Sequence, residues 1–111
     1  MSGLPPSAVL AIGPPRSGTT LIANAMMAHS RATGAMEPWH RRRREGFVDT
    51  RPEALIPFLS NPVKDTTEVL VVKETTTRAV NADLSLEFLA NARAGGAYTG
   101  LVIILRCPLT A

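Results

Sequence analysis

Several classes of protein are excluded by what the chain lacks. It has a single cysteine, Cys107, which rules out an internal disulfide framework and fits a reducing compartment. No apolar run approaches the roughly 20 residues that a membrane-spanning helix needs. The amino terminus lacks the basic segment and long apolar stretch of a secretory signal. The histidines and the cysteine show no metal-ligand spacing. We therefore expect a cytoplasmic protein with no membrane partner and no metal site.

Length and charge limit the organisation of the chain. At 111 residues it is at most one domain, and its 45% hydrophobic content is enough to bury a core. We expect residues 1–7, which are rich in Pro, Gly and Ser, to be a flexible lead-in, and residues 8–111 to form the domain. The net charge of +3 suits an anionic partner only loosely, because much of the excess comes from the run Arg41–Arg44.

The first strand–loop–helix segment carries the most specific signal. An apolar run over residues 8–12 predicts a strand, and the apolar spacing over residues 19–29 predicts a helix. The loop between them holds Gly13, Gly18 and Arg16. In such a loop successive N–H groups converge on one anion, the helix dipole favours negative charge, and arginine can bind an oxyanion bidentately. The apolar side of the helix is predicted to be Leu21, Ile22, Ala25, Met26 and Ala28.

The loop is close to the nucleotide-binding pattern G-x-x-x-x-G-K-[ST], with Gly13, Gly18 and Thr20 in register. Thr19 stands where that pattern requires lysine, and the cation sits earlier, at Arg16. The segment resembles the 5′-phosphosulfate loop of sulfotransferases that use 3′-phosphoadenosine-5′-phosphosulfate (PAPS), in particular the tyrosylprotein-type and related bacterial enzymes. The matching residues are Pro15, Arg16, Ser17, Gly18, Thr19, Thr20 and Leu21. The resemblance implies a P-loop NTPase-like, three-layer α/β/α fold with a parallel sheet.

Glu37 is the first further position that matches this family. It follows Arg16 at the distance at which the acceptor-activating glutamate follows the loop arginine in tyrosylprotein-type enzymes. Pro38 disfavours helical dihedrals at Glu37, so we expect it at a strand end or in a loop. The alternative is a surface carboxylate that pairs with Arg41 or Arg42.

A second strand is predicted over residues 68–72, continuous enough in β-branched residues to be buried on both faces. It delivers Lys73 and Glu74 at its carboxyl end, where ligands bind to open parallel sheets. The family has a lysine there, in a K-[DE]-P context, that stabilises the transferring sulfuryl group; Thr75 replaces the proline here. The alternative is a lysine that leaves the sheet for solvent.

A third two-sided strand is predicted over residues 101–105, followed by Arg106. This end resembles the family's 3′-phosphate motif, commonly R-D-P-R. Arg106 and Pro108 agree with the motif, whereas Cys107 replaces the aspartate and Leu109 the second arginine. The resemblance implies that Arg106 holds the 3′-phosphate of the donor.

The remaining elements are predicted from local signals. Residues 30–34 read as a connector, and a helix is expected to begin near Pro52. Another helix is expected to begin after Asn81 as its N-cap and to run to about Ala92, with Gly95-Gly96 closing it.

The resemblance implies sulfuryl transfer from PAPS to an acceptor hydroxyl on a small molecule, carbohydrate or peptide, without a metal. Arg16 and the loop amides of residues 17–20 would hold the 5′-phosphosulfate. Arg16 and Lys73 would stabilise the developing charge, and Glu37 would act as general base. Such enzymes are about twice as long, so we expect the N-terminal part of one, with an incomplete sheet that favours self-association.

Two other functions compete with this interpretation. The first is a P-loop kinase or NTPase, which the threonine at position 19 weakens. The second is a non-enzymatic module that binds anions or nucleic acid through Arg41–Arg44. A solvated face is the simplest explanation of this arginine run, so we do not expect nucleic acid as a partner.

Overall fold

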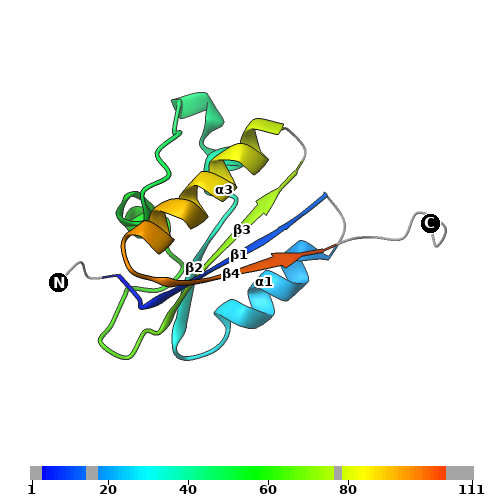
Figure 1. Cartoon of the computed structure of the whole chain (residues 1–111). Coiled ribbons are helices and arrows are strands. Elements are labelled where there is room, and N and C mark those ends of the chain that lie inside the picture. The colour runs from blue at the N-terminus through cyan, green and yellow to red at the C-terminus, as the bar shows by residue number, and fades with distance from the viewer. Residues whose placement is uncertain (1–3, 15–17, 77–78, 105–111) are drawn as a thin grey trace.

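A parallel sheet organises the chain (Figure 1). The computed structural model describes residues 4–14, 18–76 and 79–104. Within them the strands are β1 (Ser7–Gly13), β2 (Ala32–Met36), β3 (Val69–Thr75) and β4 (Tyr98–Ile103). All neighbouring strands are parallel, and their order across the four-stranded sheet is β2-β3-β1-β4. The predicted α/β class with a parallel sheet is confirmed.

Helices cover both faces of the sheet. Helix α1 (Thr19–Met27) lies on one face and α3 (Ala79–Ala94) on the other (Figure 1). The short elements between β2 and β3 are α2 (Pro38–Arg41), η1 (Arg43–Glu45) and η2 (Pro52–Phe58). In the described part of the chain, no helix is both long and apolar enough to cross a membrane.

Two apolar clusters hold these layers together. Under α1, Ala23 and Met27 pack against Val71 of β3. On the opposite face, a larger cluster packs strand residues against α2, η2 and α3. Its buried members are Ala8, Leu10, Ile12, Trp39, Leu55, Leu70, Val72, Phe88 and Ala92. Burial of the Leu, Ile, Val, Phe and Met side chains among them contributes about 1.5–3 kcal/mol each, so these clusters are the main source of stability.

Strand β2 was not predicted, because residues 30–34 read as a connector. Its sequence, ATGAM, has few of the β-branched and aromatic residues that favour strands. Pairing with β3 and burial on both faces nevertheless make it a strand. A Cβ on Gly34 would overlap the Met27 sulfur and the Val71 carbonyl oxygen, so the glycine lets α1 approach the sheet closely.

The outer edge of β2 is covered by the chain that follows η2. The Ser60 N–H donates to the Gly34 carbonyl at 2.7 Å, and the Asn61 N–H donates to Thr33 Oγ1 at 3.1 Å. The first contact satisfies the Gly34 carbonyl, one of the backbone groups that an edge strand would otherwise offer to another chain. Strand β4 forms the opposite edge of the sheet, which lies away from this covering segment.

Helix α1 buries a different side from the one predicted. Thr19, Ala23 and Met27 face the sheet, whereas Leu21 is 76% exposed. The prediction considered only which side of the helix carries apolar residues, and it therefore chose the side with the larger ones. Close packing on β2 and β3 instead selects the face with a small residue, Ala23, at its centre.

Helix α3 and strand β4 also differ in detail from the predictions. The described helix begins at Ala79, so Asn81 is a buried residue inside it and the predicted N-cap is wrong. The predicted end is confirmed: Gly96 has φ 96° and its N–H donates to the Arg93 carbonyl.

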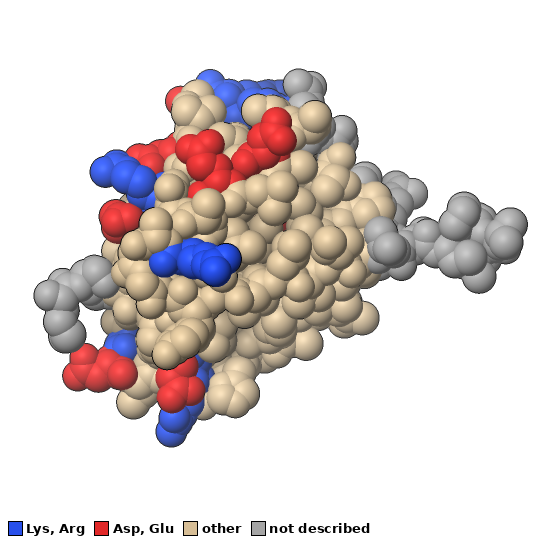
Figure 2. Space-filling model, viewed as in Figure 1, with Lys and Arg blue, Asp and Glu red and all other residues tan. Residues whose placement is uncertain are grey.

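Strand β4 begins earlier than predicted and is not buried on both faces. Leu101 is 44% and Ile103 59% exposed. Continuous apolar patterning predicts two-sided burial only for a strand inside a sheet, and β4 lies at an edge. Figure 2 shows the same view in space-filling form: a broad, mostly uncharged area that a Lys or Arg side chain interrupts, with most other charged side chains toward its margins.

Candidate active site

The phosphate-loop prediction is only partly covered by the structure. Pro15, Arg16 and Ser17 lie outside the described residues, as does Arg106. Gly18 has φ 96°, a left-handed conformation that favours glycine, and it directly precedes α1.

The first turn of α1 presents its amides next to this glycine. Its first intrahelical hydrogen bond runs from the Ile22 N–H to the Gly18 carbonyl. The amides of Thr19, Thr20 and Leu21 therefore precede that hydrogen-bond ladder, which is the usual arrangement of an anion-binding helix terminus. Thr20 is exposed, whereas Thr19 is buried.

Glu37 and Lys73 meet at the carboxyl end of the sheet. Glu37 lies between β2 and α2, with φ 49° and ψ 52°. Its position at a strand end confirms the prediction. The pairing of β2 with β3 sets Met36 beside Lys73, and the Glu37 N–H donates to the Lys73 carbonyl at 2.6 Å. The Lys73 Nζ then lies 3.3 Å from Glu37 Oε1.

Burial rules out one of the two interpretations of Lys73, that of a lysine that leaves the sheet for solvent. Its side chain is only 4% exposed and that of Glu37 17%, so the lysine does not leave the sheet for solvent. An ion pair in such surroundings interacts more strongly than a surface pair, but it also carries a desolvation cost. Lysine is seldom this buried unless it is paired, so the contact with Glu37 accounts for its position inside the fold.

These residues line one hollow of about 650 Å³. Three separate parts of the chain, namely the start of α1, the end of β2 and the end of β3, contribute to it. Its lining residues are Gly18, Thr19, Thr20, Leu21, Asn24, Glu37, Lys73 and Thr75. The structure therefore brings together the described residues that the sequence singled out from three distant motifs.

Asn24 and Thr75 were not predicted as site residues. Asn24 is four residues after Thr20 and so shares its helix face, and Thr75 is two residues after Lys73 and shares its strand face. Both could have been found from the sequence, by stepping four residues along the helix from Thr20 and two residues along the strand from Lys73.

The arginine run is partly occupied by contacts within the chain. Arg41 Nη2 lies 3.7 Å from Glu37 Oε2, so the predicted alternative partner is also present. Arg42 pairs with Glu45 at 3.7 Å, and its guanidinium carbon lies 3.7 Å from the centroid of the Phe58 ring. Arg41 is 61% exposed and contributes little to stability through its pair.

Glu74 is fully buried on β3 directly after Lys73. Burial raises the pKa of its carboxyl to about 7, and the charge of Glu37 acts in the same direction. The backbone N–H groups of Thr75, His40 and Trp39 act in the opposite direction. The folded state therefore binds a proton more tightly at Glu74 than the unfolded chain does.

This carboxyl makes the free energy of unfolding depend on pH. Because its folded pKa is raised above 4.5, its stabilising contribution is complete below about pH 4.5 and is lost as the pH rises toward and beyond 7. Between pH 5 and pH 8 the stability of the wild type should fall relative to Glu74→Gln by about 2–3 kcal/mol. Urea unfolding of both proteins at the two pH values measures this; parallel pH dependence in the two would contradict it.

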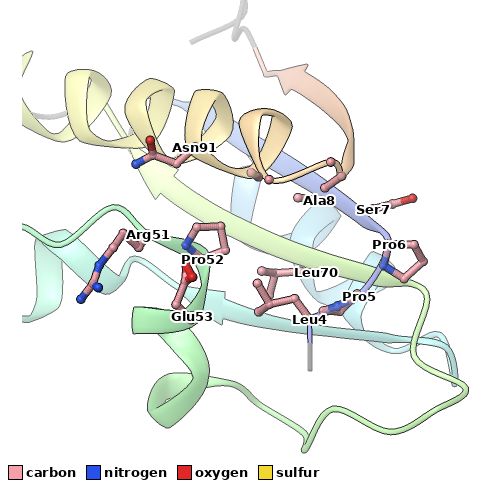
Figure 3. Close-up of a pocket in the computed structure, with 14 residues that line it drawn as sticks. Leu4, Pro5, Pro6, Ser7, Ala8, Arg51, Pro52, Glu53, Leu70 and Asn91 are labelled. Atoms are coloured by element: carbon pink, nitrogen blue, oxygen red, sulfur yellow. The ribbon is translucent and has the colours of Figure 1, made fainter. Parts of the chain in front are cut away.

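A second cavity, of about 410 Å³, lies at the opposite end of the strands (Figure 3). It is lined by the chain before and at the start of β1, by the start of η2 and by the end of α3. Two of its polar side chains are already engaged. Arg51 binds Asp49 at 2.7 Å, and the Asn91 amide donates to Thr50 Oγ1 at 3.0 Å. Among the described residues that line it, no two side chains form an ion pair as Glu37 and Lys73 do.

Neither a metal-ligand cluster among the described residues nor a known relative identifies the site. Over residues 4–14, 18–76 and 79–104, no three His, Cys, Asp or Glu side chains are grouped so that they could hold a metal ion. A scan against protein-family models finds no match to the chain, and searches of the curated proteins and of the solved structures find none either. The function of this chain is therefore inferred from the motif residues and the geometry of the hollow.

Proposed function

We propose that this chain carries the donor loop and acceptor base of a PAPS-dependent sulfotransferase. The observation that supports this most is the contact between Glu37 and Lys73, 3.3 Å apart, in a hollow that begins at the end of the donor-like loop. The finer fold assignment, a P-loop NTPase-like domain, belongs to the same proposal.

In this proposal Glu37 accepts the proton of an acceptor hydroxyl as that oxygen attacks sulfur. A new S–O bond forms to the acceptor while the bond from sulfur to the phosphate oxygen of the donor breaks. The electron pair of that bond stays on the phosphate. A positioned carboxylate of this kind contributes typically 100- to 10,000-fold to a rate.

Lys73 stabilises the negative charge that builds on the transferring group. An ammonium has three N–H donors, so its contact with Glu37 leaves two for sulfuryl oxygens. Its burial increases the strength of that interaction, because the surroundings screen charge less than water does. By resemblance, Arg16 assists from the loop.

The donor is assigned by the resemblance of the loop. Pro15, Arg16 and Ser17 would complete a cradle with the described Gly18, Thr19 and Thr20 around the 5′-phosphosulfate. Arg106 would bind the 3′-phosphate that separates PAPS from ordinary adenine nucleotides. The acceptor is a hydroxyl of a small molecule, a carbohydrate or a peptide, and the scheme needs no metal.

Thermal shift with two ligands tests this function against its rivals. 3′-Phosphoadenosine-5′-phosphate, the desulfated donor, should raise the melting temperature, and ATP with Mg²⁺ should not. Arg16→Ala should abolish the stabilisation, whereas alanine at all four positions of Arg41–Arg44 should leave it. Stabilisation by ATP–Mg²⁺ alone would indicate an NTPase. Anion binding that is lost only with the four arginines would indicate a non-enzymatic module.

A further inference from the structure

Glu74 has no role in the proposed reaction, although it is fully buried beside a proposed catalytic lysine. Successive strand residues point to opposite faces of a sheet. Lys73 therefore shares the face of Val71, under α1, and Glu74 shares the face of Val72, which packs with Trp39 and Phe88. The carboxyl group thus lies in an apolar layer, on the side of the sheet away from the lysine.

Its two oxygens accept backbone hydrogen bonds. The Trp39 N–H donates to Glu74 Oε2 at 3.3 Å, and the Thr75 N–H donates to Oε1 at 3.2 Å. Trp39 belongs to the first turn of α2, whose amides have no intrahelical acceptor. Glu37 occupies the N-cap position of α2 but makes no side-chain capping bond. Glu74 supplies the missing acceptor from β3.

This contact bears directly on the conformation of Glu37. A left-handed backbone is disfavoured for a residue with a side chain, so Glu37 needs support on both sides. On one side its own N–H is bound by the Lys73 carbonyl. On the other side the Trp39 amide is bound by Glu74. The indole N–H of Trp39 also donates to the Asp49 carbonyl at 2.9 Å, which fixes the start of α2 in the core.

We propose that Glu74 is a positioning residue that holds the first turn of α2, and with it Glu37, so that the Glu37 carboxylate stays against the Lys73 ammonium. Its importance for turnover rests on the proposed function, whereas its action on α2 does not. A leucine at this position would suit the surrounding layer better, because buried ionisable groups are often less stable than apolar replacements of similar size. The raised pKa of Glu74 shows this unfavourable burial.

Three variants separate positioning from stability. Glu74→Leu removes both acceptors and keeps the volume, and Glu74→Gln keeps one acceptor oxygen. The control, Ser85→Ala, removes a buried hydroxyl that donates within α3, to the Asn81 carbonyl at 2.7 Å. For each protein we would measure the urea midpoint, amide hydrogen exchange by NMR, and sulfuryl transfer from PAPS.

In Glu74→Leu two effects on the urea midpoint oppose each other: the buried carboxyl is removed, but the Trp39 and Thr75 N–H groups lose their acceptor, so the midpoint should change little. Exchange at the Trp39 amide should nevertheless accelerate by about tenfold or more relative to the amides of Val71 and Val72, because its bond to a carboxyl is lost. The kcat should fall by about tenfold or more with KM for PAPS unchanged, since the donor loop is untouched. Glu74→Gln should lie between wild type and leucine, and Ser85→Ala should lower the midpoint alone.

Unchanged hydrogen exchange at the Trp39 amide in Glu74→Leu would overturn the proposal. It would also be overturned if kcat fell among the variants only in proportion to the loss of the urea midpoint. If the leucine variant does not fold, the exchange rate in Glu74→Gln decides in its place. If the wild type neither binds the desulfated donor nor transfers sulfate, the proposed function fails. In that case the exchange rates alone test whether Glu74 holds the first turn of α2.

Discussion

Glu37→Gln is expected to lower kcat for sulfuryl transfer by about 100- to 10,000-fold, the usual contribution of a general base. Glutamine has nearly the same shape and can still contact Lys73, but it cannot accept the acceptor proton. Affinity for 3′-phosphoadenosine-5′-phosphate should stay close to the wild-type value, because Glu37 lies on the acceptor side of the lysine in our scheme. Transfer of labelled sulfate from PAPS to phenol and sugar acceptors, with calorimetry for binding, measures both quantities.

Glu45→Gln is the matched control. Glu45 is exposed and pairs with Arg42 at 3.7 Å, so its removal changes the same net charge close to the arginine run without touching the hollow. It should have wild-type kcat. If both glutamines reduce transfer equally, the effect is one of overall charge and Glu37 is not the base.

Lys73→Met is expected to lower kcat by about 100- to 1,000-fold, as when one charge-stabilising donor is removed from other active sites. Methionine has a similar length and suits a side chain that is 4% exposed, so the fold should be retained. Lys73→Arg should not restore the rate, because a planar guanidinium cannot replace a compact ammonium in a buried contact with Glu37. Steady-state kinetics and urea midpoints for both variants measure this.

Lys64→Met serves as the control, since Lys64 is exposed in the connector before β3. It should behave as the wild type in both measurements. A wild-type kcat in Lys73→Met would remove the lysine from the mechanism. A loss of kcat that is matched by a collapse of the urea midpoint would show a structural role instead.

The sequence predicts those parts of the fold in which local patterning and burial agree. Strands β1 and β3 have continuous apolar sequences and lie at the centre of the sheet, so both were found. Strand β2 was missed because pairing with β3, rather than its own composition, makes it a strand. The exposure of β4 was missed because edge position is a property of the whole sheet. Self-association through that edge stays a prediction.

The sequence predicted individual residues of the candidate site but not how they are arranged in space. Spacing indicated Glu37, and the end of a buried strand indicated Lys73. Their contact depends on β2 lying beside β3, which the sequence did not show. The role of Glu74 depends on the same arrangement, because only a folded β3 brings its carboxyl to the first turn of α2. Long-range pairing of this kind leaves no local signal in one sequence.

In our proposal the donor end of the site lies where α1 begins and β3 ends. An NMR titration of the whole chain with 3′-phosphoadenosine-5′-phosphate would locate the donor site directly. The amide signals of residues 18–20 and 73–75 should shift together and saturate, while those of Ser7 and Asn91, at the opposite cavity of Figure 3, should not move. Shifts centred on Ser7 and Asn91, or no shifts at all in a folded sample, would be incompatible with a donor site at this end of the sheet.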